Sequence, residues 1–157
     1  MLMISKRHFV LNICLLVFPW LSVLLLGKRN VKRYSLAGVS IVIFEIINHF
    51  IGYMRNWWTF YDKRKSFLTN ELPFSVGPYM PLSMWILKYS FGNFKKFLLL
   101  NAISDGLFAF VIINFLKKIK IIRLNITNFQ FFCYLYYKAF LLYGIQYLVE
   151  NKRIFKG

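Results

Sequence analysis

The 157 residues are 59% hydrophobic and 20% aromatic, and their formal net charge is +16 at pH 7. A soluble domain averages about 45–50% apolar residues and does not gather them in uncharged runs of about twenty, the length that crosses the hydrocarbon of a bilayer. The composition therefore argues against the soluble classes. It predicts one membrane domain over 1–157, with no room for a separate soluble domain.

The basic residues lie mainly between the apolar runs, in three clusters. Lys and Arg near the membrane surface interact with anionic lipid headgroups, and each contributes on the order of 1 kcal/mol there. We therefore expect a bilayer with anionic headgroups as the partner, and no nucleic acid. The clusters are Lys28, Arg29, Lys32 and Arg33; Arg55, Lys63, Arg64 and Lys65; and Lys117, Lys118, Lys120 and Arg123.

Five apolar runs predict an all-α integral membrane bundle of about five transmembrane helices. The first run also fits a secretory signal, because it follows a basic start. No A-x-A-like site follows it, however, and Lys28 and Arg29 come directly after it, so we expect a retained helix. A basic hairpin loop is expected over 28–34. The predicted spans are 9–27, 35–54, 73–91, 97–116 and 126–149.

The segment between the second and third spans is polar but rich in aromatic residues. Trp57, Trp58 and Tyr61 come just after the second span, and amphipathic rings prefer the headgroup level of a bilayer. We expect these three residues to form an interfacial anchor. A stacking platform for bases or sugars is the alternative.

The third span contains Pro73, Pro78 and Pro81. Prolines near the start of a helix are tolerated, because the first N–H groups have no intrahelical partner. A full span and a re-entrant half-helix both agree with this pattern. The alternative architecture is therefore four spans and one re-entrant segment.

The fourth and fifth spans complete the bundle. Asp105 and Gly106 would indicate a turn in a soluble chain. The apolar pieces on either side are too short to cross a membrane alone, which favours a continuous or locally broken helix. Residues 117–125 alternate basic and apolar side chains and are expected to lie along the interface, and 150–157 to form a basic tail.

Five spans place the two termini on opposite sides of the membrane. The excess of Lys and Arg in cytoplasmic loops usually sets the orientation, but the two possible sides carry almost equal numbers here. The densest cluster lies in the shortest loop, after the first span. That cluster favours a cytoplasmic first loop and a cytoplasmic C-terminus.

Polar side chains recur at helical spacing inside three of the spans. In two of them they follow an i, i+3, i+4 pattern, which places them on one helix face. A charge near the bilayer centre costs about 3 kcal/mol, so these faces should turn toward one another. We predict a buried polar seam with Lys138 between the carboxylates of Glu45 and Asp105. Its residues are Glu45, Asn48, His49, Asn101, Ser104, Asp105 and Lys138, with Gln130, Tyr134 and Tyr137 on the stripe of Lys138.

The seam has a structural and a functional interpretation. Interhelical polar contacts in membranes are worth about 1 kcal/mol each and fix which helices pair. Carboxylate, histidine and lysine groups at the midplane also move charge in pumps and transporters. For catalysis there is no GxSxG, HExxH, phosphate-loop or CxxC motif, and Cys14 and Cys133 lack metal-binding spacing. We expect no catalytic residue, metal or cofactor.

Several short strings resemble those of small multi-pass membrane proteins from low-GC Gram-positive bacteria. This resemblance implies a bacterial cytoplasmic membrane and a third span that contains proline and glycine. It implies no activity and no catalytic residue. The strings are Trp57-Trp58, Leu72-Pro73-Phe74, Gly77-Pro78-Tyr79, Trp85-Ile86 and YSFGNF from Tyr89 to Phe94, together with Tyr143 and Gln146.

Three functions follow from these patterns. The first is a non-enzymatic accessory or interaction module, acting with another membrane protein or as a homo-oligomer. The second is a proton- or cation-linked transporter, which would need an oligomer because one five-helix chain is small for a pathway. The third is a lipid-modifying enzyme that works at the interface.

Overall fold

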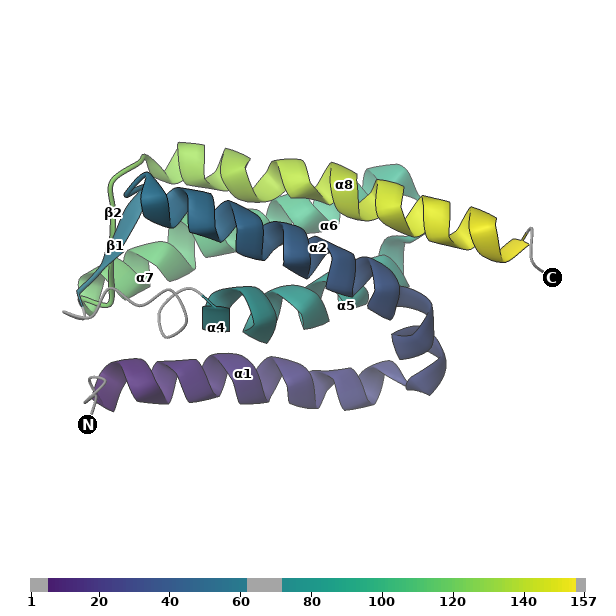
Figure 1. The fold of residues 1–157 in the computed structure, drawn as a ribbon, viewed down its shortest axis with the longest axis horizontal. Coiled ribbons are helices and arrows are strands. Elements are labelled where there is room, and N and C mark those ends of the chain that lie inside the picture. The colour runs from purple at the N-terminus through teal and green to yellow at the C-terminus, as the bar shows by residue number, and fades with distance from the viewer. Residues whose placement is uncertain (1–5, 62–71, 155–157) are drawn as a thin grey trace.

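The structure is a computed structural model that describes residues 6–61 and 72–154. These residues form five helical segments, which run alternately in opposite directions, and one short strand pair (Figure 1). The start of the first helix and the end of the last lie at opposite ends of the bundle. The elements are α1 (Lys6–Leu26), α2 (Lys28–Met54), β1 (Trp58–Phe60), α4 (Leu72–Phe74), the π-helix η1 (Ser75–Tyr79), α5 (Met80–Ser90), α6 (Phe94–Gly106), the π-helix η2 (Leu107–Ile112), α7 (Ile113–Lys118), β2 (Ile122–Leu124) and α8 (Asn128–Ile154).

The described chain is mostly helical, and three of its helices are long and apolar enough to cross a membrane. They cover Phe9–Leu26, Lys28–Met54 and Phe94–Lys118. The third of these is continuous through Asp105 and Gly106, which confirms that this pair makes no turn here. The helix passes directly from α6 through η2 into α7.

The predicted basic loop over 28–34 is wrong. The chain reverses at Gly27, whose φ of 84° is a conformation that glycine adopts without steric cost. The carbonyl of Gly27 then accepts hydrogen bonds from the N–H groups of Asn30 and Val31. The basic cluster therefore lies on the first turns of α2.

Four of the helical segments form a ring, and α1 packs outside it. Helix α2 contacts α5 and α8, and α6 also contacts both α5 and α8, while α1 packs mainly against η1 and α5 (Figure 1). Buried apolar residues fill the ring in two clusters. One surrounds Met84 and Phe97, and the other surrounds Ile113 and Phe131.

The all-α prediction missed a strand pair at one end of the bundle. Strand β1 pairs antiparallel with β2, with Thr59 opposite Arg123. Residues 117–125, expected along the interface, therefore end α7 and then form β2. Each strand has only three residues, which is too short for an alternating pattern to stand out in the sequence.

The end of α8 also differs from the prediction. The expected tail from Glu150 onward continues the helix to Ile154. The carboxylate of Glu150 accepts a 2.9 Å hydrogen bond from Arg33 Nε of α2. The guanidinium of Arg33 also lies over the ring of Phe91. These contacts link α2, α5 and α8 at this end of the bundle.

Helix α1 lies close to the third segment at Gly77. A Cβ atom at this position would lie 2.4 Å from the backbone oxygen of Leu15. Two tryptophans stabilise the same contact. Trp20 Nε1 donates to the carbonyl of Val76 at 3.0 Å. Trp85 Nε1 of α5 donates to Ser22 Oγ of α1 at 3.1 Å. The absence of a side chain at Gly77 therefore sets the distance between the two segments.

We predict that Gly77→Ala lowers the free energy of unfolding by about 1–3 kcal/mol, because the new methyl group must push α1 away. The matched control is Gly144→Ala on α8, where an added Cβ meets nothing within 4 Å. That control should not destabilise the protein. Thermal unfolding in detergent compares the two variants, and equal stability would contradict the close approach at Gly77.

Candidate functional site

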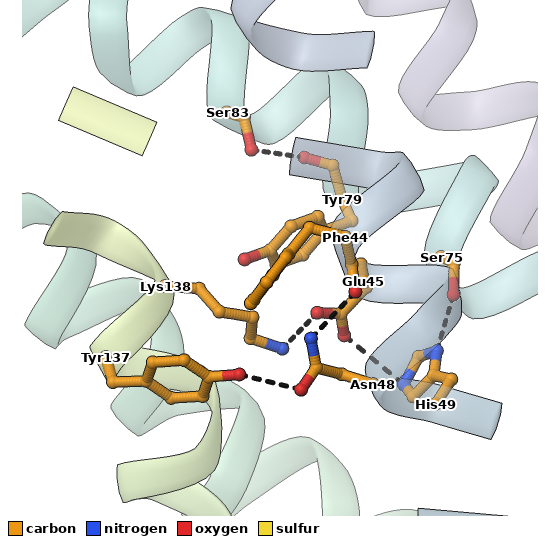
Figure 2. A network of polar contacts seen from close by, with 9 residues as sticks. All are labelled: Phe44, Glu45, Asn48, His49, Ser75, Tyr79, Ser83, Tyr137 and Lys138. Atoms are coloured by element: carbon orange, nitrogen blue, oxygen red, sulfur yellow. Dashed lines mark hydrogen bonds and ion pairs between the residues drawn. The ribbon is translucent and has the colours of Figure 1, made fainter. Parts of the chain in front are cut away.

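The polar face of α2 points into the ring, as the spacing predicts. Glu45 and His49 are buried, and Asn48 between them is half-buried. They lie one helical turn apart or less, so their side chains form one continuous patch. Figure 2 shows this patch facing α8 on one side and the third segment on the other.

The centre of the site is an ion pair between α2 and α8. Lys138 Nζ donates to Glu45 Oε2, and both side chains are almost completely buried. The ammonium also lies 4.1 Å from the centroid of the Tyr134 ring and 5.2 Å from that of Tyr79. Cation–π contacts of this kind help to replace the water that the ammonium has lost. The prediction that Lys138 faces Glu45 agrees with this geometry.

His49 continues the chain of polar contacts to the third segment. Its Nε2 lies 3.3 Å from Glu45 Oε1, and its Nδ1 is hydrogen bonded to Ser75 Oγ. A neutral imidazole has one donor and one acceptor nitrogen. With Nε2–H donating to the carboxylate, Nδ1 accepts the hydroxyl proton of Ser75. The chain from Ser75 through His49 and Glu45 to Lys138 thus joins three helical segments.

Asn48 forms a separate bridge to α8. Its side-chain N–H donates to the carbonyl of Phe44 at 2.7 Å, and its oxygen accepts a 2.8 Å hydrogen bond from the hydroxyl of Tyr137. Both contacts appear beside the ion pair in Figure 2. The second contact between α2 and α8 therefore uses neutral groups.

The fourth segment contributes less to the cluster than the spacing suggested. Asn101 is buried, but its side chain donates to the carbonyl of Phe97 on its own helix. Ser104 and Asp105 are half-buried and line a cavity. Among the described residues, no ion pair within 4 Å reaches the carboxylate of Asp105. Among the described carboxylates, the direct ion pair of Lys138 is therefore with Glu45.

Gln130 lies outside the cluster because it caps α8. Its side-chain oxygen accepts from the N–H of Thr127 at 2.9 Å, and the hydroxyl of Thr127 accepts from the N–H of Gln130 at 3.1 Å. This is a capping box, and its T-x-x-Q signature is readable in the sequence. The stripe prediction overlooked that signal.

The predicted site does not include Ser75 and Tyr79. Both belong to η1, where a π-helix turns residues by a different angle from an α-helix. The α-helical spacing rule therefore gives no signal for them. The ring face of Tyr79 lies against the ammonium of Lys138. The hydroxyl of Ser75 is hydrogen bonded to Nδ1 of His49 and so fixes the orientation of the imidazole.

The cavity has a volume of about 370 Å³ and is lined almost entirely by apolar side chains. All five helical segments and both strands contribute to its wall. Its polar groups come from two residues of α2, two residues of α6 and one residue of η1. The polar lining residues are Glu45, His49, Tyr79, Ser104 and Asp105.

The three residues expected to form an interfacial anchor lie in different environments. Trp58 is only 3% exposed, and its ring packs edge-on against His49 with centroids 5.5 Å apart. It also covers Gly52, where a Cβ would lie 2.4 Å from the indole. Trp57 is half-buried, and Tyr61 is exposed. Trp58 therefore belongs to the core, and of the three residues only Tyr61 is exposed.

The order carboxylate, imidazole, hydroxyl resembles the arrangement that activates a serine nucleophile. Here, however, Ser75 is 0% exposed and does not line the cavity, and Glu45 is already paired with Lys138. A substrate has no approach to its oxygen. Among the described residues there is also no group of three His, Cys, Asp or Glu side chains that could hold a metal ion.

No protein-family model matches the chain, and no curated protein and no solved structure matches it. We therefore infer the function from the geometry of the residues themselves. The resemblance to small multi-pass proteins of low-GC Gram-positive bacteria stays a prediction.

We predict that Ser75→Ala lowers the free energy of unfolding by about 1–3 kcal/mol, because it leaves the buried Nδ1 of His49 without a partner. The matched control is Ser83→Ala: Ser83 is also buried, but its hydroxyl donates only to the carbonyl of Tyr79 on its own helix. That control should change stability by less than about 0.5 kcal/mol. Equal losses in the two variants, measured by thermal unfolding, would contradict the role of Ser75.

Proposed function

We propose that the chain is a five-span protein of the bacterial cytoplasmic membrane, a non-enzymatic accessory or interaction module. In this proposal the polar cluster holds the helices in one arrangement and does no chemistry. The observation that carries the proposal is the closure of the cluster upon itself. Glu45, Lys138, His49 and Ser75 find their partners within the bundle.

The membrane location is supported by three helices that are long and apolar enough to span. The other two segments also have the necessary length: 72–90 extends ~28 Å at the usual rise per residue, close to the ~30 Å of bilayer hydrocarbon. Their polar groups face inward, since Ser75, Ser83 and Lys138 are buried. Large apolar side chains such as Leu148 face outward. This inside-out distribution suits a lipid environment.

The structural role of the cluster is supported by what its contacts join. The ion pair and the bridge from Asn48 to Tyr137 connect α2 with α8, and the contact from His49 to Ser75 connects α2 with η1. In hydrocarbon the apolar surfaces of two helices attract each other little more than they attract lipid. Directional polar contacts therefore decide which helices pair and in which register.

Transport and catalysis have less support. A proton or cation relay needs polar groups that lead away from Glu45. Besides Tyr79, Ser104 and Asp105, the cavity wall away from α2 is formed by apolar residues such as Phe108, Leu116 and Ile122. A serine-based enzyme needs an accessible nucleophile, and Ser75 is fully buried. A module that acts through its surface needs neither feature.

We predict that the two termini lie on opposite sides of the membrane, with the C-terminus in the cytoplasm. A green fluorescent protein fused to the C-terminus should fluoresce, and alkaline phosphatase at the same position should be inactive. The reverse pattern is expected for fusions to the N-terminus. Reporters that place both termini on one side would contradict five spans and favour four spans with a re-entrant segment.

We predict that Glu45→Gln and Lys138→Met each lower the free energy of unfolding by about 3–5 kcal/mol, because each strands a buried charge. The double variant should recover most of that loss. The matched control is the more exposed pair of Arg33 and Glu150, where the corresponding single variants should cost less than about 1 kcal/mol.

Thermal unfolding in detergent measures all these variants. The informative comparison is between the double variant and the two single variants. A stranded charge destabilises the single variants but not the double variant, whereas a lost contact destabilises all three. Single variants of Glu45 and Lys138 that fold as well as the wild type would contradict the structural role. A charge relay would then become the better explanation of the cluster.

A further inference from the structure

The cavity is too large to be a packing defect. Folded interiors are close-packed and contain few voids larger than a water molecule, whereas this cavity measures about 370 Å³. That volume falls in the range of sites for small molecules, about 300–1,000 Å³. An empty apolar cavity loses the dispersion contacts of its wall. Water needs two to four polar partners, which only the polar lining residues supply, so it would leave the apolar wall without contacts.

The cavity reaches the outer surface of the bundle on its lipid-facing side. Three of its lining residues, Leu82 of α5 with Leu107 and Ile112 of η2, are large apolar side chains that are also exposed. They form a rim between the third and fourth segments. In the membrane location proposed above, what meets this rim is the hydrocarbon chain of a lipid. The bilayer is therefore the source of molecules that can enter.

The wall of the cavity offers a hydrogen-bond acceptor. The carboxyl of Asp105 lines it beside the hydroxyl-bearing Ser104. The cation of the cluster, Lys138, is already bound to Glu45, and among the described residues no hydrogen bond reaches the Asp105 carboxylate. The carboxyl of Asp105 is half-buried, and a partly desolvated acceptor gains from a hydrogen-bond donor. A ligand with a hydrogen-bond donor at the end of an apolar chain would satisfy it.

We propose that this cavity binds a long-chain lipid alcohol taken from the bilayer, with its alkyl chain against the apolar wall and its hydroxyl donating to Asp105. The inference rests on the proposed membrane location and adds a ligand to it. A hydroxyl is favoured over an ammonium, because a neutral group enters hydrocarbon at far lower cost than a charge does. The binding step is noncovalent.

The experiment uses two photoreactive probes in liposomes that contain the full chain. One is dodecanol with a diazirine in mid-chain, and the other is the same chain without the hydroxyl. Labelling is read by peptide mass spectrometry at two leucines of α8. Leu135 is 6% exposed and lines the cavity, whereas Leu148 is 61% exposed and lies outside it.

We expect both probes to label Leu148 equally, because it faces lipid. The alcohol should label Leu135 about tenfold more than the hydrocarbon probe does, the factor that one hydrogen bond to a carboxylate confers. Asp105→Leu should remove this difference at Leu135 and leave Leu148 unchanged. The comparison of the two probes needs no variant, so it stands even where a substitution impairs folding.

A second arm blocks the cavity. Ser104→Phe places a ring in it and should abolish labelling of Leu135, while Ile103→Phe, at an exposed neighbouring position, should not. Labelling of Leu148 without Leu135 would overturn the cavity proposal and leave the membrane location intact. Equal labelling of Leu135 by the two probes would overturn recognition of the hydroxyl. Absence of labelling at both leucines would overturn the membrane location and the ligand with it.

Discussion

The buried ion pair between Glu45 and Lys138 is the constraint on which the rest of the bundle depends. Two full charges without water are stable only when they meet each other in good geometry, so α2 and α8 have one permitted register. The aromatic rings of Tyr134 and Tyr79 complete the surroundings of the ammonium. Because Tyr79 belongs to η1, the third segment is positioned by the same charge.

The short strand pair is coupled to this constraint through an aromatic contact. Trp58 of β1 lies on Gly52 and against His49, and it also packs against Phe131 of α8. A glycine is required beneath it, because any side chain at position 52 would occupy the place of the indole. The strand pair therefore closes the end of the ring where α2 ends and α8 begins, and it forms part of the cavity wall.

Much of this arrangement could be predicted from hydrophobic period and charge placement. The existence of the helices and the inward face of Glu45 and His49 follow from apolar runs interrupted at i, i+3 and i+4. The rest depends on features that such rules do not contain. The turn at Gly27 depends on one φ angle, the strand pair on a tertiary contact between short segments, and Ser75 on a π-helix whose angular spacing differs from 3.6 residues per turn.

The cluster and the cavity are connected by an imbalance of charge. Two acids, Glu45 and Asp105, lie in this part of the bundle, but Lys138 is the one ammonium among the described residues of the cluster, and Glu45 binds it. A carboxyl group that lines an apolar cavity and makes no ion pair within 4 Å among the described residues is better explained by a ligand than by helix pairing alone.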